Sequence, residues 1–196
     1  MVELPKLILA SGSPRRAEIL ASVGWRFTKH AADIDESERS GEAAAAYVLR
    51  LALEKAEAVA RFYPDETVLG ADTTVVIDGQ ILGKPVDIDD AVRMIGLLAG
   101  RWHEVLTGVA VVANVHARSA IQRTRVKFSP MTSSEIEFLA HRGDPLDKAG
   151  AYAVQAQAAL FIERIDGDYW NVVGLPVSLV YELVMGTKTQ VTPASP

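Results

Sequence analysis

Hydrophobic positions along this chain recur with two periods, one typical of strands and one typical of helices. The stretch from Val2 to Ala10, which ends in an apolar run, and the β-branched run from Thr67 to Asp78 predict buried strands. Apolar residues spaced three and four apart predict helices over Pro14 to Val23 and Asp87 to Leu98. The alanine-rich stretch from Gly41 to Phe62 predicts one long helix or two joined helices.

The rest of the chain also contains both strand-like and helix-like spacings of hydrophobic residues. The other expected strands and helices are a strand over Phe27 to Ile34, a hairpin of His103 to Ala113 with Ala120 to Phe128, helices over Ser133 to His141 and Leu175 to Met185, and strands over Ala151 to Ala153 and Leu160 to Ile165. Because helices and strands alternate throughout, the expected class is α/β with a mixed sheet. We expect one domain over residues 1–186 and a flexible polar tail over residues 187–196.

Composition and charge reduce the range of possible functions. The chain has 196 residues, 49% of them hydrophobic, and no cysteine, which excludes disulfides, thiolate zinc sites and cysteine nucleophiles. A net charge of −5 argues against general binding to a nucleic-acid backbone. No apolar run predicts a membrane span or a signal peptide, so neither is expected. An acidic protein that binds a polyanion must gather its cations locally or use a metal.

The first candidate site is the turn from Ser11 to Arg16, where an apolar strand ends and a helix begins. Ser13 suits the N-cap and Pro14 the first helical turn. A helix N-terminus favours anions, and the guanidiniums of Arg15 and Arg16 can fork onto phosphate oxygens. The turn therefore predicts an anion site, with a solvated arginine pair as the alternative.

Four further charged residues have both a functional and an ordinary interpretation. Asp72 interrupts an apolar strand, so it is either buried and paired or exposed in a cleft at the end of the strand. Lys84 is aimed by a stiff Gly-Lys-Pro turn or is simply a loop lysine. Lys55 lies on an alanine-rich helix face and points into a cleft or into solvent. Glu36, in an acidic loop, binds a hard cation or is merely solvated.

Gln155 is a further candidate, because its side-chain amide has the donors and the acceptor needed to read the edge of a base. It is otherwise an ordinary loop glutamine. His103 precedes a strand and is expected to be structural. The chain contains neither GxxxxGK[ST] nor GxGxxG, and no two histidines are spaced like a zinc pair. A P-loop or a Rossmann site is therefore excluded at the level of motifs.

Taken together, these segments resemble the Maf family of nucleoside triphosphate pyrophosphatases, over nearly the whole chain from Leu7 to Leu183. Each motif alone is weak, but eight of them in this order are specific. They are Ser11-Gly-Ser-Pro-Arg-Arg16, Asp35-Glu36, Lys55-Ala56, Gly70-Ala-Asp-Thr73, Gly83-Lys-Pro85, His103-x-Val-x-Thr-Gly108, Asp147-Lys-Ala-Gly-Ala-Tyr152 with Gln155, and Asn171-Val-Val-Gly-Leu-Pro176.

The resemblance implies an elongated mixed sheet with flanking helices and a cleft between two lobes, similar to the inosine-triphosphate pyrophosphatases. It implies a cytoplasmic, homodimeric enzyme that uses Mg²⁺ or Mn²⁺ to convert a nucleoside triphosphate to the monophosphate and pyrophosphate. Asp72 would accept the proton and contact the metal, and Glu36 would be a second metal ligand. The residues that would bind the triphosphate are Ser11, Arg15, Arg16, Lys55 and Lys84.

Three positions match the members of the family that hydrolyse dTTP and UTP: Arg15, Thr73 and Gln155. The 7-methyl-GTP type has Trp in place of the first arginine and Gln after the catalytic Asp. Two positions depart from the family pattern, because Asp144 replaces the usual Glu and Ala156 the usual Gly. If that glycine had a positive φ, alanine would strain the turn.

Two rival functions remain open. One is a nucleotide-binding regulator of septum formation with little hydrolysis. Retention of Asp72, Glu36 and Lys84 argues against it, since binding alone needs no base. The other is a hydrolase of inosine or xanthosine triphosphate, against which Thr73 and Gln155 argue.

Overall fold

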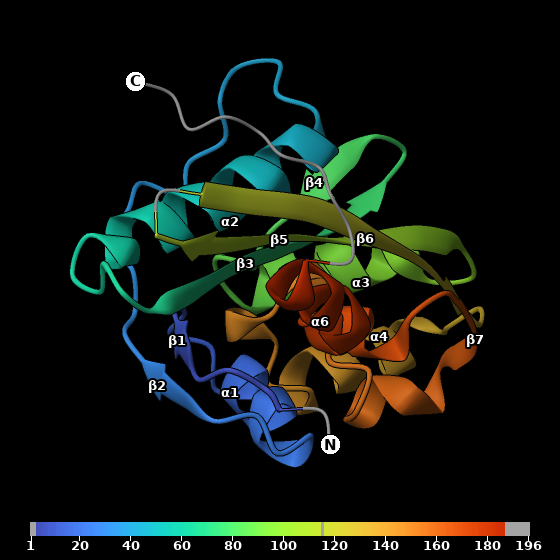
Figure 1. The fold of residues 1–196 in the computed structure, drawn as a ribbon. Helices are drawn as coiled ribbons and strands as arrows, with labels where there is room; N and C mark the ends of the chain where they lie inside the picture. The colour runs from blue at the N-terminus through green and yellow to red at the C-terminus, as the bar shows by residue number, and fades with distance from the viewer. Residues whose placement is uncertain (1–2, 115, 187–196) are drawn as a thin grey trace. The chain divides into compact units, whose positions relative to one another are not determined.

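The computed structural model describes residues 3–114 and 116–186 of the chain. In these ranges seven strands form one mixed sheet, in the order β2-β1-β3-β5-β6-β7 with β4 paired to β3 (Figure 1). The strands are β1 (Leu7–Leu9), β2 (Phe27–Lys29), β3 (Thr67–Ile77), β4 (Gln80–Leu82), β5 (Trp102–Ala113), β6 (His116–Phe128) and β7 (Ile162–Asp166). The helices are α1 (Pro14–Ser22), α2 (Ala44–Ala60), α3 (Ile88–Leu98), α4 (Ser133–Arg142), α5 (Tyr169–Val173) and α6 (Val177–Met185). The predicted α/β class with a mixed sheet is confirmed, whereas the predicted tail over residues 187–196 lies outside the described ranges.

The pairing of β1 with β3 positions the candidate site. The two strands are parallel, with Leu9 opposite Leu69, and the Ala10 N–H donates to the Leu69 carbonyl at 2.8 Å. Parallel strands place their carboxyl ends at the same edge of a sheet. The turn that begins at Ser11 therefore follows β1 on the side toward which β3 continues to Asp72.

Antiparallel pairing links the later strands. The β3–β4 hairpin turns at Asp78 and Gly79, which have φ of 51° and 77°. Two consecutive positive φ angles are what a tight two-residue hairpin requires, and Asp followed by Gly adopts them readily. Strands β6 and β7 are also antiparallel, with Val126 opposite Ile165.

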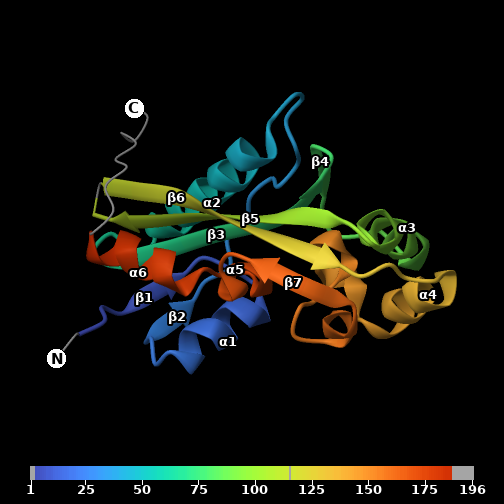
Figure 2. The same ribbon diagram turned by 90° about the vertical axis from the view of Figure 1, so that its right-hand side faces the viewer.

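The chain divides into two compact units, each with its own hydrophobic core. The first contains the described parts of Met1–Asp72, Thr107–Gln122 and Gly174–Pro196, and the second contains Thr73–Leu106 and Arg123–Val173. In the first unit, α2 packs its small side chains onto the sheet, and Figure 2 shows α2 and α6 on opposite sides of the strands. In the second unit, α3 and α4 lie against each other and enclose Leu98, Phe128 and Leu139.

Most predicted elements are confirmed within a few residues, but four differ. The strands expected over Val2 to Ala10 and over Phe27 to Ile34 are only three residues each, β1 and β2. The strand expected at Ala151 to Ala153 is wrong, because Ala149–Ala151 forms a 3₁₀ turn in which Gly150 and Ala151 have φ of 67° and 63°. Helix α5 was not expected.

The 149–151 turn follows from tertiary packing. A Cβ on Gly150 would lie 2.8 Å from Val75 Cγ2, so the backbone itself packs on β3 there. A local hydrophobic pattern carries no information about such a contact.

Among the described residues, no helix is long and apolar enough to cross a membrane.

Candidate functional site

The middle of β3 faces helix α2 closely because of Gly70. Side chains two apart on a strand point to the same face, so Gly70 and Asp72 share one. A Cβ on Gly70 would lie 2.1 Å from the Ala52 carbonyl oxygen, so only glycine allows α2 to come this near. Ala52 and Ala56 make the helix side of the contact equally small. Asp72 therefore lies close to α2, at Lys55, which is one helical turn after Ala52.

Lys55 of α2 pairs with two carboxylates. Its Nζ donates to Asp72 Oδ1 at 2.7 Å and forms an ion pair with Glu36 Oε1 at 3.0 Å. Asp72 and Lys55 are buried, with 8% and 6% of their surface exposed, whereas the Glu36 side chain is 50% exposed. Of the two alternatives for Asp72, the structure shows the buried and paired one. Lys55 is likewise buried rather than solvated.

The Ser11–Arg16 turn lies in the same unit. Ser11 Oγ accepts the Ser13 N–H at 3.2 Å and Arg16 Nη1–H at 3.0 Å, and Arg16 Nε donates to the Gly174 carbonyl at 2.9 Å. Burial lowers the pKa of the Arg16 guanidinium, and the nearby Asp72 carboxylate opposes that shift. Ser13 occupies the N-cap position without a side-chain cap bond. Ser11 instead orders the turn and holds Arg16.

The first unit thus brings five of the predicted residues into one charged cluster. Glu36 and Asp72 both act electrostatically on Arg16, and both contact Lys55. Arg15 follows Pro14 in the first turn of α1 and is half-buried. The members of the cluster are Ser11, Arg16, Glu36, Lys55 and Asp72.

The other predicted residues belong to the second unit. Thr73 follows Asp72 on β3, is half-buried, and points to the opposite face of the strand. Lys84 and Gln155 are exposed. The Gly150 N–H donates to the Gly83 carbonyl at 3.0 Å, so the turn that carries Lys84 is tied to the segment just before Gln155.

The two departures from the family pattern have different local consequences. Ala156 has φ of −121°, so alanine meets no positive-φ strain at this position. Asp144 has φ of 48°, a conformation that aspartate tolerates better than most residues. Its carboxylate lies 3.1 Å from Lys148 Nζ, and Asp147 lies 2.5 Å from the same atom. The buried Lys148 charge is therefore satisfied within its own turn.

The donor set suits a magnesium-like cation that arrives with a phosphate ligand. The described residues contain no group of three or more acidic or histidine side chains placed to hold a metal. Asp72 and Glu36 nevertheless bring carboxylate oxygens to the same Lys55 ammonium. Mg²⁺ is commonly bound by one or two carboxylates, waters and substrate phosphates rather than by a complete protein cage. These two side chains fit that pattern.

Sequence reasoning missed two side chains near Glu36. Tyr47 Oη donates to the Glu36 carbonyl at 3.0 Å, and Arg50 Nη2 donates to the Ser37 carbonyl at 3.1 Å. Burial, with Asp72 as the next contribution, raises the pKa of Tyr47 to about 12, so the hydroxyl stays protonated. Both partners are backbone carbonyls of a loop, so no residue type in the sequence marks the contact.

His103 is structural, as expected. It is 2% exposed, and its Nε2 lies 2.8 Å from the hydroxyl of Tyr152. Both rings pack edge-on against Phe128. The His103–Tyr152 pair therefore joins β5 to the 149–152 turn inside the core of the second unit.

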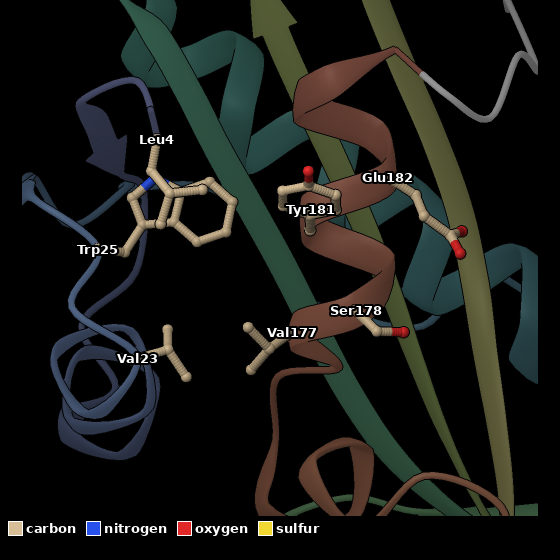
Figure 3. A pocket seen from close by; sticks show the side chains of 7 residues that line it. All are labelled: Leu4, Val23, Trp25, Val177, Ser178, Tyr181 and Glu182. Carbon is tan, nitrogen blue, oxygen red and sulfur yellow. The ribbon is translucent and has the colours of Figure 1, made fainter. Parts of the chain in front are cut away.

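An apolar pocket of about 470 Å³ lies elsewhere on the first unit. Figure 3 shows Val23 and Trp25 on one side and Val177 and Tyr181 of α6 on the other. None of the predicted site residues lines it. An apolar lining does not suit a triphosphate, so the charged cluster at Asp72 is the candidate site.

The fold places this chain in a known structural class. It is similar to the solved structure of the Staphylococcus aureus Ham1 protein, with a TM-score of 0.53, 13% identity, and coverage of 93% of this chain and 100% of that one. At this identity the likeness shows the fold alone. Residues 6–187 match the family model described as Maf-like protein. The chain belongs to the Maf family.

Named relatives cover most of the chain. A protein of Hahella chejuensis is 53% identical over 175 residues, covering 88% of this chain and 87% of the relative. One from Myxococcus xanthus is 51% identical over 171 residues, covering 87% of each. One from Symbiobacterium thermophilum is 47% identical over 181 residues, covering 92% of this chain and 93% of the relative. All three are named dTTP/UTP pyrophosphatase.

Proposed function

We propose that this protein is a divalent-metal-dependent pyrophosphatase that hydrolyses dTTP and UTP to the monophosphate and pyrophosphate. The observation that carries the proposal is the buried Asp72 carboxylate, paired with Lys55 beside the Arg16 guanidinium. The names of relatives about half identical in sequence support the same substrates. Modified pyrimidine triphosphates belong to the same proposed class.

The cationic side of the site binds the triphosphate. Ser11, Arg15, Arg16 and Lys55 supply hydroxyl, guanidinium and ammonium donors, and charge-assisted bonds to phosphate are the strong kind. Burial of Arg16 and its bonds to Ser11 and Gly174 fix the fork before substrate arrives. Lys84 is proposed as a further phosphate ligand on the strength of its Gly-Lys-Pro turn.

Asp72 is the proton acceptor. A water oxygen attacks the α-phosphorus, the bond from that phosphorus to the bridging oxygen breaks, and pyrophosphate leaves. The proton of the attacking water passes to Asp72. The Lys55 ammonium orients this carboxylate by donating to its Oδ1 at 2.7 Å. Such general-base assistance contributes about 10²- to 10⁴-fold to a rate.

Asp72 and Glu36 would hold the divalent cation, Mg²⁺ or Mn²⁺. When bound, such an ion supplies positive charge that stabilises negative charge on the transferring phosphate and the leaving group. Lys55 now neutralises both carboxylates. Because an ammonium group has three N–H donors, Lys55 can keep its bond to Asp72 and also donate to a phosphate oxygen.

Pyrimidine preference is proposed to reside in Arg15, Thr73 and Gln155. A glutamine amide can pair with the O4 and N3–H edge of uracil or thymine, because it has one acceptor and two donors in one plane. The exposed Gln155 side chain is available for such pairing. The resemblance to the family further supports a cytoplasmic homodimer, which sedimentation of the purified protein tests.

A pyrophosphate-release panel tests the proposal. The panel contains dTTP, UTP, CTP, ITP and 7-methyl-GTP, each with and without Mg²⁺. We expect metal-dependent release from dTTP and UTP, and a fall in kcat of about 10³-fold for Asp72→Asn. Asp78→Asn is the matched control, because Asp78 lies at the exposed β3–β4 turn and pairs with Arg101.

Each alternative has its own signature in that panel. Binding of nucleotide without metal-dependent release from any of them would support the regulator of septum formation. Preference for ITP would indicate the purine house-cleaning activity, and preference for 7-methyl-GTP would overturn the pyrimidine assignment. Full activity of Asp72→Asn would remove Asp72 as the base while leaving the enzyme intact.

A further inference from the structure

The loop that carries Glu36 is attached to α2 by two side chains one helical turn apart. Residues 30–43 connect β2 to α2 without helix or strand. Tyr47 Oη donates to the carbonyl of Glu36 at 3.0 Å, and Arg50 Nη2 donates to the carbonyl of Ser37 at 3.1 Å. Residues three apart on a helix share a face, so both donors reach consecutive peptide groups. The two peptide groups that directly follow the Glu36 Cα are thereby linked to the helix.

Arg50 is itself held firmly. Its Nε and Nη2 each lie 2.7 Å from one carboxylate oxygen of Glu42, in a bidentate fork, and its Nη1 lies 3.2 Å from Glu54. The Arg50 and Glu42 side chains are only 12% and 10% exposed. A planar guanidinium in a bidentate pair keeps little freedom. Arg50 is therefore a conformationally restricted donor to the Ser37 carbonyl.

Glu36 needs such support more than Asp72 does. Asp72 is fixed within β3, whereas Glu36 is on a loop and its side chain is half exposed. Ordering a loop and a long carboxylate on ligand binding costs conformational entropy. Prior fixation of the backbone removes part of that cost. Mutation of a group that orients a metal ligand in this way typically weakens the binding of the metal.

We propose that Tyr47 and Arg50 are positioning residues that hold Glu36 for the divalent cation of the reaction. The inference rests on the proposed function, because it takes Glu36 as a metal ligand. It adds that the affinity for the metal is set partly by two side chains of α2 that touch neither metal nor substrate.

The test is Mn²⁺ binding to the full-length protein with the non-hydrolysable α,β-methylene-UTP, followed by the electron paramagnetic resonance of free Mn²⁺. Tyr47→Phe removes one hydroxyl and should weaken Mn²⁺ binding about fivefold. Tyr63→Phe is the matched control: its hydroxyl lies 3.1 Å from His30 Nδ1, just beyond the other end of α2. This control should bind Mn²⁺ like wild type.

Activity gives a second readout. Tyr47→Phe should lose turnover of dTTP at limiting Mn²⁺, and excess Mn²⁺ should restore it. Arg50→Lys keeps a charge but loses the fork, and should weaken Mn²⁺ binding in the same direction. Equal Mn²⁺ affinity in Tyr47→Phe and Tyr63→Phe would overturn the inference.

Glu36→Gln separates this inference from the proposed function. If Glu36→Gln weakens Mn²⁺ binding while Tyr47→Phe does not, the proposed metal role stands and the positioning role is wrong. If Glu36→Gln leaves Mn²⁺ binding unchanged, the assignment of Glu36 as a metal ligand fails, and the positioning role fails with it. Thermal melting of each variant checks that the fold is retained.

Discussion

Single buried polar residues have different tasks in the two units. Lys55 and Asp72 in the first unit neutralise each other at 2.7 Å, and such pairs are costly to break from one side. His103 in the second unit has no acidic partner among the described residues, and burial lowers its pKa to about 3. It therefore stays neutral in the folded protein and serves as a hydrogen-bond partner for Tyr152.

The lowered pKa of His103 predicts acid sensitivity of the fold. The unfolded chain takes up a proton near pH 6.5, whereas the folded state does so only near pH 3. Between these values the unfolded state binds more protons, so the His103 contribution is fully present above pH 6.5 and is lost as the pH falls. The slope is about 1.4 kcal/mol per pH unit.

Urea unfolding between pH 7 and pH 4 checks this expectation. His103→Gln keeps a partner for the Tyr152 hydroxyl and should show a shallower loss of unfolding free energy than wild type. His116→Gln, at an exposed position on β6, should follow the wild-type slope. If the unfolding free energy of His103→Gln falls with pH as steeply as that of wild type, His103 is not the source of the acid sensitivity.

At the scale of elements, α2 and the strands beneath it depend on two glycines. Gly70 on β3 faces Ala52, and a Cβ on Gly108 of β5 would lie 2.2 Å from the Val48 carbonyl oxygen. Helix backbone therefore rests directly on strand backbone at both points. This close approach brings Lys55 within reach of Asp72.

Gly70→Ala should accordingly destabilise the protein by about 3 kcal/mol or more, because the obstructing atoms are backbone and cannot rotate away. Gly96→Ala is the opposite control, since a Cβ there meets nothing within 4 Å and α3 gains a better helix former. It should stabilise by about 0.5–1 kcal/mol. Chemical denaturation measures both, and a Gly70→Ala cost below about 1 kcal/mol would argue against the close contact.

For the whole molecule, the net charge has the same sign as the charge of the proposed substrate. The net charge is −5, so overall electrostatics repel a nucleoside triphosphate. Attraction must come from the few cations of the site, and their number is small enough for each to be tested singly. Salt screens such charges over about 8–10 Å at physiological ionic strength.

The KM for dTTP should therefore rise between 50 and 300 mM NaCl. Lys84→Gln should raise the KM about tenfold and make its salt dependence shallower, because a charge-assisted phosphate contact is lost. Lys29→Gln removes the same charge from the exposed end of β2 and should behave like wild type. If the two variants have the same KM, Lys84 is not a phosphate ligand.

The sequence alone determined most of the elements, because strong periodicity and local caps act within a few residues. Asp87 caps α3 at the Asp90 N–H, and Asp78-Gly79 forms the hairpin turn, both as the residue types predict. Motif order likewise indicated the family. Among the elements that the sequence misjudged, the 149–151 turn depends on a distant partner, because the Gly150 backbone packs on Val75 of β3.

Only the tertiary structure decided between the alternatives at the candidate site. Whether Lys55 is buried depends on Gly70, fifteen residues away, letting α2 approach β3. That Tyr47 supports Glu36 depends on a loop carbonyl, which every residue type possesses. Propensity is local, whereas burial, pairing and backbone contacts arise only when distant segments pack, and these contacts are what turned isolated charged residues into one site.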